Sequence, residues 1–448
     1  MNVTRLLGPV RRWVDTWRPS EVTHGLPTFP LFVLFGLNAA DELDRSAFAI
    51  LLPDIRDDFG LSDAGALALV SASTIAVLLI AVPLSFYCDR ANRVRIATAG
   101  AALWGVFSFG TALAVAPLML IVMRIGSGTG RAVVEPTHNS LLADWYPPSA
   151  RVKVFSVHRQ ANSVGQVLGP ALGGLLAFLF TWRVPFALFA IPTIVLVLFA
   201  LRLKEPVRGF HERRAAGADE ATALVEDQHE TVRSTMRVLA RVRTIRRVWW
   251  AVPFLGIAIF AVPNLLALVY EDVFQLNSLQ RGAISAGIEP LQIAGVFVAM
   301  PRVARVAMTD PGFLLRFVSI VGVADAIFLV ILAYAPGLPV AIGMHALLAA
   351  SIGTLAPAFF ALLSLVAPPR VRAAAFSTIA VFAVPGIAVF LPLIGIVSDA
   401  YGIQASMFVL VPVALTAGFI LSTAANLVLP DIAASHAEAV ARVDRKPI

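Results

Sequence analysis

The stretch PPSARVKVFS at residues 147–156 returns as PPRVRAAAFS at residues 368–377. Both copies follow the pattern P-P-x-x-R-x-x-x-F-S, and they stand 221 residues apart. Chance readily supplies one such match, but hardly several in one register. We therefore predict two halves related by a parallel repeat, an arrangement in which two bundles rock about a central site. The same offset pairs Pro136 with Pro357, Gly165 with Gly386 and Gly174 with Gly395.

The composition places the chain in a membrane. Of its 448 residues 58% are hydrophobic and 14% are charged, and the mean hydropathy is +0.82. Soluble globular proteins carry roughly 25% charged residues. These values exclude a soluble enzyme, a disordered chain and a nucleic-acid-binding domain, despite the net charge of +7. The single cysteine, Cys88, excludes an intramolecular disulfide and a cysteine-based metal site, and no cofactor is expected.

Hydropathy predicts an all-α membrane protein of twelve transmembrane helices. A spanning helix needs roughly 20 mostly apolar residues. Lys and Arg are concentrated in one set of connections, which predicts that both termini are cytoplasmic. The opposite connections hold only Arg56, Arg183 and Arg281 and are otherwise acidic. The predicted spans are 29–52, 64–87, 95–115, 118–141, 154–180, 184–201, 248–270, 282–303, 312–335, 338–365, 373–397 and 402–428.

Five regions follow from these spans. Apolar residues at helical spacing near the N-terminus indicate either a helix in the cytoplasmic interface or a disordered basic tail. Val238, Leu239, Val242 and Ile245 predict an amphipathic helix late in the central linker. The regions are a cytoplasmic basic segment (1–28), an N-terminal six-helix bundle (29–201), a cytoplasmic linker (202–247), a C-terminal six-helix bundle (248–428) and a cytoplasmic tail (429–448).

Three motifs resemble those of the major facilitator superfamily. The stretch SFYCDRANR at residues 85–93 is similar to its signature loop G-x-x-x-D-R-x-G-R, with Ser85 and Asn92 in place of two glycines. Residues 124–130, RIGSGTG, match its R-x-x-x-G-x-G motif. Residues 165–174 hold glycines spaced as in part of the motif associated with exporters. The resemblance implies the major facilitator fold and secondary transport.

A closer resemblance is to the spinster branch, whose members move lysolipids and sphingosine phosphates. It rests on LDR at 43–45, LPDI at 52–55, DRANR at 89–93 and LLAD at 141–144, and covers roughly residues 35–200. Spinster-type proteins have a glutamate directly after the R-x-x-x-G-x-G motif, where this chain has Arg131. Proton coupling through that glutamate therefore cannot be carried over to this chain. Glu135, one helical turn further on, could substitute for it.

Ionisable residues at membrane depth are the candidate site. Each costs at least ~2.5–3.5 kcal/mol, so it usually faces a cavity and has a partner. The predicted fourth span puts Arg124, Arg131, Glu135 and His138 on one helix face. On the first span Asp41, Asp44 and Arg45 share a face, and Glu42 is expected to point elsewhere. The alternative is ion pairs that only lock helices together, and Arg124 is the strongest candidate for that role.

The site roles follow from this pattern. We expect proton coupling through Asp41, Asp44 or Glu135, with Arg45 as the partner of Asp44. Substrate binding is expected at Arg45, Arg131, Glu135, His138, Arg159 and Gln166. In the second half only Glu289, Asp325 and His345 are ionisable at depth, among apolar walls. A site charged on one wall and apolar on the other suits an amphiphile. No second histidine follows His138 or His345 at i+4, so no metal site is predicted.

A cytoplasmic gate is expected around the 85–93 loop. Arg93 is expected to pair with Asp89 and Asp144, and Arg90 belongs to the same motif. The superfamily resemblance implies that this group closes the inner face in the outward-facing state. The same charges would also serve to orient the protein in the membrane without forming a gate, and the two roles are compatible.

The sequence thus predicts a secondary transporter of the cell membrane, a monomer with no nucleic-acid partner and no enzymatic activity. The expected substrate is a lysolipid-like amphiphilic anion, exported or flipped, with protons as the coupling ion and membrane lipids as surroundings. The alternatives are a proton-coupled multidrug exporter, a membrane-embedded acyltransferase and a non-transporting receptor. The acyltransferase pattern H-x4-D is absent, as is a G-x4-G-K-[ST] nucleotide loop.

Overall fold

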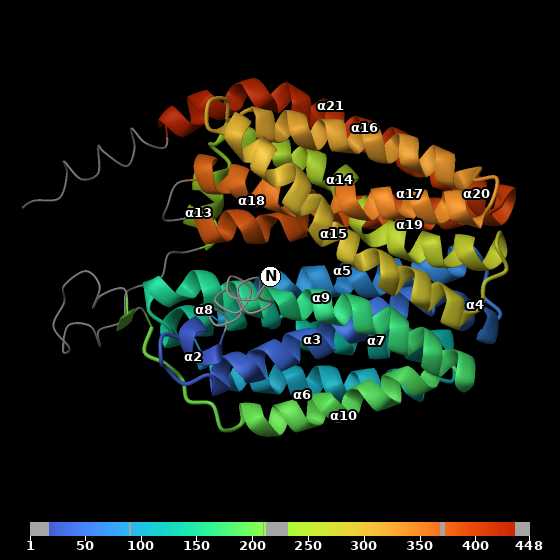
Figure 1. Cartoon of the computed structure of the whole chain (residues 1–448), viewed down its shortest axis with the longest axis horizontal. Helices are drawn as coiled ribbons and strands as arrows, with labels where there is room; N and C mark the ends of the chain where they lie inside the picture. The colour runs from blue at the N-terminus through green and yellow to red at the C-terminus, as the bar shows by residue number, and fades with distance from the viewer. Residues whose placement is uncertain (1–17, 89–90, 209, 212–231, 368–371, 435–448) are drawn as a thin grey trace, which may run out of the picture.

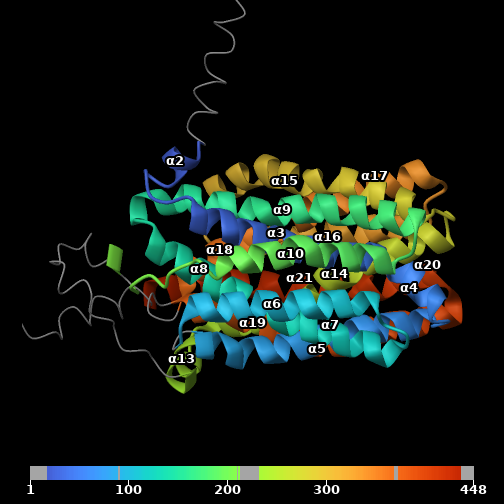
Figure 2. The same cartoon turned by 90° about the horizontal axis from the view of Figure 1, so that it is seen from below.

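The computed structural model describes residues 18–88, 91–208, 210–211, 232–367 and 372–434. Every regular element in these ranges is helical, and the long helices run along one axis of the molecule (Figures 1 and 2). Nine helical segments of the described residues are long and apolar enough to cross a membrane. The all-α fold is therefore as predicted. The count of twelve spans and the cytoplasmic termini stay predictions.

The first half of the chain forms one group of helices, coloured blue to green at the bottom of Figure 1. Its elements are α2 (Pro19–Val22), α3 (Phe29–Ile50), α4 (Leu52–Asp58), α5 (Asp63–Cys88), α6 (Arg93–Ala112), α7 (Pro117–Arg131), α8 (Val134–Trp145), α9 (Pro148–Leu179) and α10 (Arg183–Ala200).

The second half forms the other group, coloured yellow to red. Its elements are α13 (Val232–Leu239), α14 (Arg243–Asp272), α15 (Ser278–Ala307), α16 (Phe313–Ala333), α17 (Leu338–Ile352), α18 (Leu355–Val366), α19 (Arg372–Tyr401), α20 (Ile403–Ser406), η2 (Met407–Val409), α21 (Leu410–Ala424) and η3 (Ala425–Leu427). We call the end of the molecule that carries α4 and α20 the α4 end, and the opposite end the α13 end (Figure 1).

Local sequence sets where two of these helices begin. The Asn92 side chain accepts a hydrogen bond from the Arg95 backbone N–H (2.8 Å) and so caps α6. Asn277 and Gln280 form a reciprocal capping box at the start of α15. Prolines interrupt the backbone hydrogen bonds inside α9, α14, α15 and α19. Helices packed within a membrane bundle tolerate such interruptions.

The predicted fourth span is not one helix. It divides into α7, which ends at Arg131, and α8, which begins at Val134. The predicted tenth span divides in the same way, between Ile352 and Leu355. Both breaks stand at the repeat offset, so they belong to the fold and not to one local sequence. The expectation that one helix carries the residues from Arg124 to His138 is therefore wrong, because Arg131 and His138 belong to different helices.

The two halves meet where α9 packs against α15 and α5 packs against α19. Glycines allow this approach. A Cβ atom at Gly174 would lie 2.3 Å from the Ser278 carbonyl oxygen, and one at Gly282 would lie 2.2 Å from the Pro170 carbonyl oxygen. Any larger side chain there would push α9 and α15 apart.

The central linker and the N-terminus differ in part from expectation. The expected amphipathic helix is two helices, since α13 ends at Leu239 and α14 begins at Arg243. Leu239 and Ile245 are both buried. Residues 1–17, 209 and 212–231 lie outside the described part of the chain, so the expected N-terminal interfacial helix and the middle of the linker stay predictions. Residues 368–371, at the start of the second copy of the repeated stretch, also lie outside the described part of the chain.

Candidate functional site

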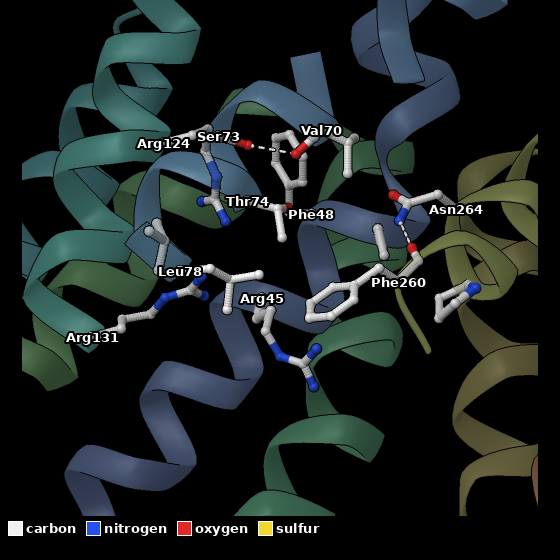
Figure 3. A pocket seen from close by; sticks show the side chains of 13 residues that line it. Arg45, Phe48, Val70, Ser73, Thr74, Leu78, Arg124, Arg131, Phe260 and Asn264 are labelled. Carbon is white, nitrogen blue, oxygen red and sulfur yellow. Dashed lines mark hydrogen bonds between the residues drawn. The ribbon is translucent and has the colours of Figure 1, made fainter. Parts of the chain in front are cut away.

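A cavity of about 150 Å³ lies between the two halves. That is room for several water molecules, since one needs roughly 10–15 Å³ by this measure. Arg45 comes to it from α3, Arg124 and Arg131 from α7, and Phe260 and Asn264 from α14 (Figure 3). The remaining lining residues come from α3, α5 and α14: Phe48, Ala49, Val70, Ser73, Thr74, Val77, Leu78 and Pro263.

Helix α3 carries Arg45 and the acids that pair with the arginines of this cavity. It has 22 residues, and its four ionisable side chains lie within five consecutive residues. Arg45 donates to both carboxylate oxygens of Glu42, through Nε at 3.1 Å and through Nη2. Gln166 of α9 donates to the same Glu42 at 3.0 Å. The expectation that Glu42 points elsewhere is therefore wrong, since Glu42, and not Asp44, is the partner of Arg45.

Asp44 pairs with Arg124 instead. It is fully buried, and it accepts hydrogen bonds from Arg124 Nη1 at 2.9 Å and from the Ser108 hydroxyl of α6. The Arg124 guanidinium stacks 4.2 Å from the centre of the Phe48 ring. This pair joins α3, α6 and α7 in the interior of the first half. The expected pairing of Asp44 with Arg45 is corrected by this geometry.

Arg131 pairs with the third acid of α3. Its Nε lies 3.3 Å from Asp41 Oδ1. Its Nη1 is buried and has no hydrogen-bond partner in the described structure. An unpartnered buried guanidinium nitrogen is costly, because its desolvation is not compensated. The side chain of Glu135, expected to tune Arg131, lies outside the described part of the chain.

The charges of the first half balance around the cavity: three acids on α3 face three arginines. A fourth acid comes from the second half, where Glu289 of α15 interacts electrostatically with Glu42 and Arg45. Gln292 donates to Glu289. An anionic ligand would compete with the acids of α3 for the arginines. A cationic ligand would find Glu289, the one of these four acids for which the described structure has no arginine ion pair.

Two of the expected binding residues lie elsewhere. His138 of α8 is buried, and its Nδ1 lies 3.2 Å from Nε2 of His158 on α9. The His158 carbonyl accepts from Asn38 of α3, which also donates to Asn162. Arg159 is exposed. Neither His138 nor Arg159 lines the cavity, so their expected role in substrate binding is not supported there. Gln166 does not line it either, and its side chain donates to Glu42.

The expected gate lies at the α13 end. Arg93 is almost fully buried and donates to Asp144, to the Ser140 hydroxyl at 2.6 Å and to Glu205 at 2.7 Å. The structure thus joins Arg93 and Asp144, but it adds Glu205, which the sequence analysis missed. Asp89 and Arg90 lie outside the described residues, so their part in a gate stays a prediction.

The α4 end is held by ion pairs between the halves. Arg281 of α15 is fully buried and donates to Asp54 of α4 and to the Leu276 carbonyl, and it lies 3.1 Å from Glu271. Arg56 of α4 donates to both carboxylate oxygens of Asp272 at 2.8 and 2.9 Å. Burial in this cluster raises the pKa of Asp54.

The sequence analysis missed or misplaced several residues of the site because their partners lie far away along the chain. Glu42, Ser108, His158, Glu205 and the α4-end cluster are all involved in contacts between residues far apart in the chain. For Glu42 a signal existed, because Glu and Arg three residues apart on a helix are neighbours. For Ser108 and His158 no pattern of spacing would have found the partner.

Comparison with known families matches this architecture. A family model described as Major Facilitator Superfamily matches residues 34–387, most of the chain. The chain belongs to this superfamily. It is a multi-pass membrane protein of a family of transporters, and the enzyme alternatives receive no support from its relatives.

Among superfamily members, the chain is similar to the hexuronate transporter of Bacillus subtilis (strain 168), with 29% identity over 161 residues, 36% of this chain and 38% of that protein. It is also similar to the protein spinster of Drosophila melanogaster, with 27% identity over 292 residues, 63% of this chain and 47% of that protein. The chain thus spans less than half the length of these two relatives.

The solved structures show the same fold. A bacterial homologue of the human lysosomal transporter Spinster, inward-facing and unoccupied, aligns with a TM-score of 0.74 at 18% identity. The alignment covers 90% of this chain and 98% of that chain. The spinster-like resemblance of this superfamily member is therefore confirmed in sequence and in fold.

Proposed function

We propose that this protein is a secondary active transporter that works by alternating access and exports or flips a lysolipid-like amphiphilic anion. The observation that carries the proposal is the buried Nη1 of Arg131, which has no hydrogen-bond partner in the described structure and belongs to a residue that lines the cavity. A phosphate or carboxylate oxygen would supply the missing acceptor in a charge-assisted hydrogen bond.

The walls of the cavity support an amphiphile. The apolar part of the lining includes Phe260 and Pro263 of the second half, and Val70, Val77 and Leu78 of α5. A ligand with one charged group and an apolar body matches both surfaces. The hexuronate transporter among the relatives carries an organic acid by its name, which agrees with an anion-binding site.

Proton coupling is part of the proposal, and the geometry favours Asp41 over Asp44. Arg131 is the only ion-pair partner described for Asp41, and at 3.3 Å it is a loose one. An anion that takes Arg131 leaves Asp41 without its cation in a poorly hydrated place, and a carboxylate in that position takes up a proton. Asp44 is held more firmly, because both Arg124 and the Ser108 hydroxyl donate to it. Glu135 remains a second candidate.

Ligands with matched tails test the proposal. Binding of dodecyl phosphate and of dodecyltrimethylammonium is measured on the protein in lipid nanodiscs, with empty nanodiscs as blank. Arg131→Ala is expected to weaken dodecyl phosphate at least about tenfold, the loss of one charged hydrogen bond of roughly 1.5–3 kcal/mol. Dodecyltrimethylammonium is expected to bind as before. Arg316→Ala is the control, because Arg316 pairs with Asp310 outside the cavity.

Three other outcomes contradict the proposal in different ways. Equal losses for both ligands in Arg131→Ala mean that the arginine is structural. Preference of the unsubstituted protein for the cation favours the alternative, a proton-coupled multidrug exporter in which Glu289 receives the positive charge. Tight binding of glucuronate, which has no apolar tail, means that the substrate is a small organic acid and not an amphiphile.

A further inference from the structure

A second, smaller cavity lies inside the second half, away from the arginines. Its volume is about 20 Å³, enough for roughly one water molecule. Asp325 of α16 lines it and is only 6% exposed. No other ionisable residue of the described chain lines this cavity. The remaining lining residues come from α14, α16, α17, α18 and α21: Phe254, Leu255, Val262, Gly322, Leu329, Leu348, Ile352, Leu355, Leu410, Val413 and Ala414.

Asp325 has one hydrogen-bond partner in the described structure, the hydroxyl of Ser351 on α17. The charged and titratable groups on the neighbouring helices are engaged elsewhere. His345 of α17 bonds to the Tyr270 hydroxyl of α14 at 2.9 Å, and Glu289 of α15 accepts from Gln292. No described basic side chain pairs with Asp325. The three acids of α3, in contrast, each face an arginine.

The hydrogen bonds of Ser351 favour a protonated Asp325. The Ser351 oxygen lies within hydrogen-bond distance of Asp325 Oδ1 and also 2.9 Å from the Leu348 carbonyl. A serine hydroxyl has a single hydrogen to donate. Two acceptors would therefore compete for it if Asp325 were ionised. If Asp325 carries a proton, it donates to Ser351 and Ser351 donates to Leu348, and every group is satisfied.

The repeat supplies an internal comparison. At the offset of 221 residues, Asp325 corresponds to Trp104 of α6 and Ser351 to Gly130 of α7. In the first half Gly130 packs directly on the backbone of Trp104, where a Cβ atom would lie 2.5 Å from the Trp104 nitrogen. The same contact between helices is thus built there without an acid. Packing alone does not require a carboxyl group at this place.

We propose that Asp325 is a proton-binding site of the second half, and that Ser351 links its protonation to the break between α17 and α18. Ser351 lies in the last turn of α17, and Thr354 within the break donates to the Ser351 carbonyl at 2.6 Å. With its proton, Asp325 holds α16 against the break. Without it, the carboxylate needs a cation or more water than this cavity holds, so α16 and α17 separate to hydrate it.

Infrared spectroscopy of the full-length protein in nanodiscs tests this site with protons alone. Unsubstituted protein at pH 7 is expected to show a protonated-carboxyl band that shifts in D2O and is missing in Asp325→Asn. Ser351→Ala is expected to keep this band but to move its frequency, because the hydrogen bond is lost. Asp310→Asn, at an exposed ion pair, is the control and leaves the band unchanged.

The outcomes are separable. If Asp325→Asn removes no protonated-carboxyl intensity, Asp325 is ionised and the proposal is wrong. If Asp325→Asn does not fold, the Ser351→Ala spectrum decides, since an unmoved band excludes Asp325 as its source. This test needs no transport, so it stands apart from the function proposed above. The coupling step alone rests on that function, and it predicts that Asp325→Asn exchanges substrate but no longer accumulates it in response to a pH gradient.

Discussion

At the scale of single residues, the first half of the protein is held by a buried ion pair. Asp44 is fully buried, and Arg124 is 6% exposed between Asp44 and the Phe48 ring. Taking both charges out of water is costly, and their attraction compensates only with good geometry. Removing one partner is therefore expected to be worse than removing both.

We predict that Asp44→Leu lowers the free energy of unfolding by about 3–5 kcal/mol, because it leaves Arg124 buried and unpaired. The double variant Asp44→Leu with Arg124→Met is expected to recover most of this loss. The measurement is thermal unfolding in a mild detergent. Asp310→Ala, which breaks an exposed pair, serves as control and should cost less than about 1 kcal/mol. A double variant as unstable as the single one contradicts the prediction.

At the scale of helices, the contact between the halves depends on backbones that touch. Gly282 of α15 faces Pro170 of α9, with no room for a side chain. Gly287, also on α15, has nothing within 4 Å of its Cβ position. Gly282 and Gly287 therefore allow a controlled comparison on one helix, because only Gly282 lies at the contact between the halves.

We predict that Gly282→Leu opens the α4 end, whereas Gly287→Leu does not. The reporter is Ala49→Cys, at a residue that lines the cavity, in a Cys88→Ser background. Labelling by a maleimide that cannot cross the membrane, added from the α4 side, is expected to become several-fold faster in Gly282→Leu. Equal labelling rates in the two leucine variants would mean that the close contact of α9 and α15 does not control access.

At the scale of the whole molecule, the α4 end is closed by ion pairs that cross between the halves. Arg281 and Asp54 belong to different halves and are joined there, as are Arg56 and Asp272. Arg183 and Asp58 form an ion pair at the same end but within the first half, and the hydrogen bond from Arg183 lowers the pKa of Asp58. When the halves rock apart, the ion pairs between the halves must break, whereas the Arg183–Asp58 pair can stay.

We predict that Arg281→Gln shifts the protein toward a state open at the α4 end, because Asp54 and Glu271 lose their buried cation. In the same Ala49→Cys assay, labelling from the α4 side is expected to rise at least about tenfold, which corresponds to roughly 1.4 kcal/mol. Arg183→Gln is the control and should leave the rate unchanged. A rise of the same size in Arg183→Gln would assign the effect to loss of charge at this end in general.

Much of the architecture is determined by sequence alone. Hydropathy over lengths that match a bilayer predicts the helices, because lipid leaves the backbone no other hydrogen-bond partner than itself. The 221-residue repeat predicts two equivalent halves, and the register of α7 and α8 with α17 and α18 agrees with it. The charged residues of α3 and α7 are visible as exceptions in apolar helices, which identifies the candidate site but not its pairs.

The tertiary structure decided the charge pairs that join different helices. Asp44 stands next to Arg45 in the sequence, yet it pairs with Arg124, 80 residues away. The helix breaks, the closure of the α4 end and the isolation of Asp325 were equally invisible in the sequence. The physical reason is that Coulomb attraction depends on distance and local dielectric, and both are set by how helices from distant parts of the chain pack.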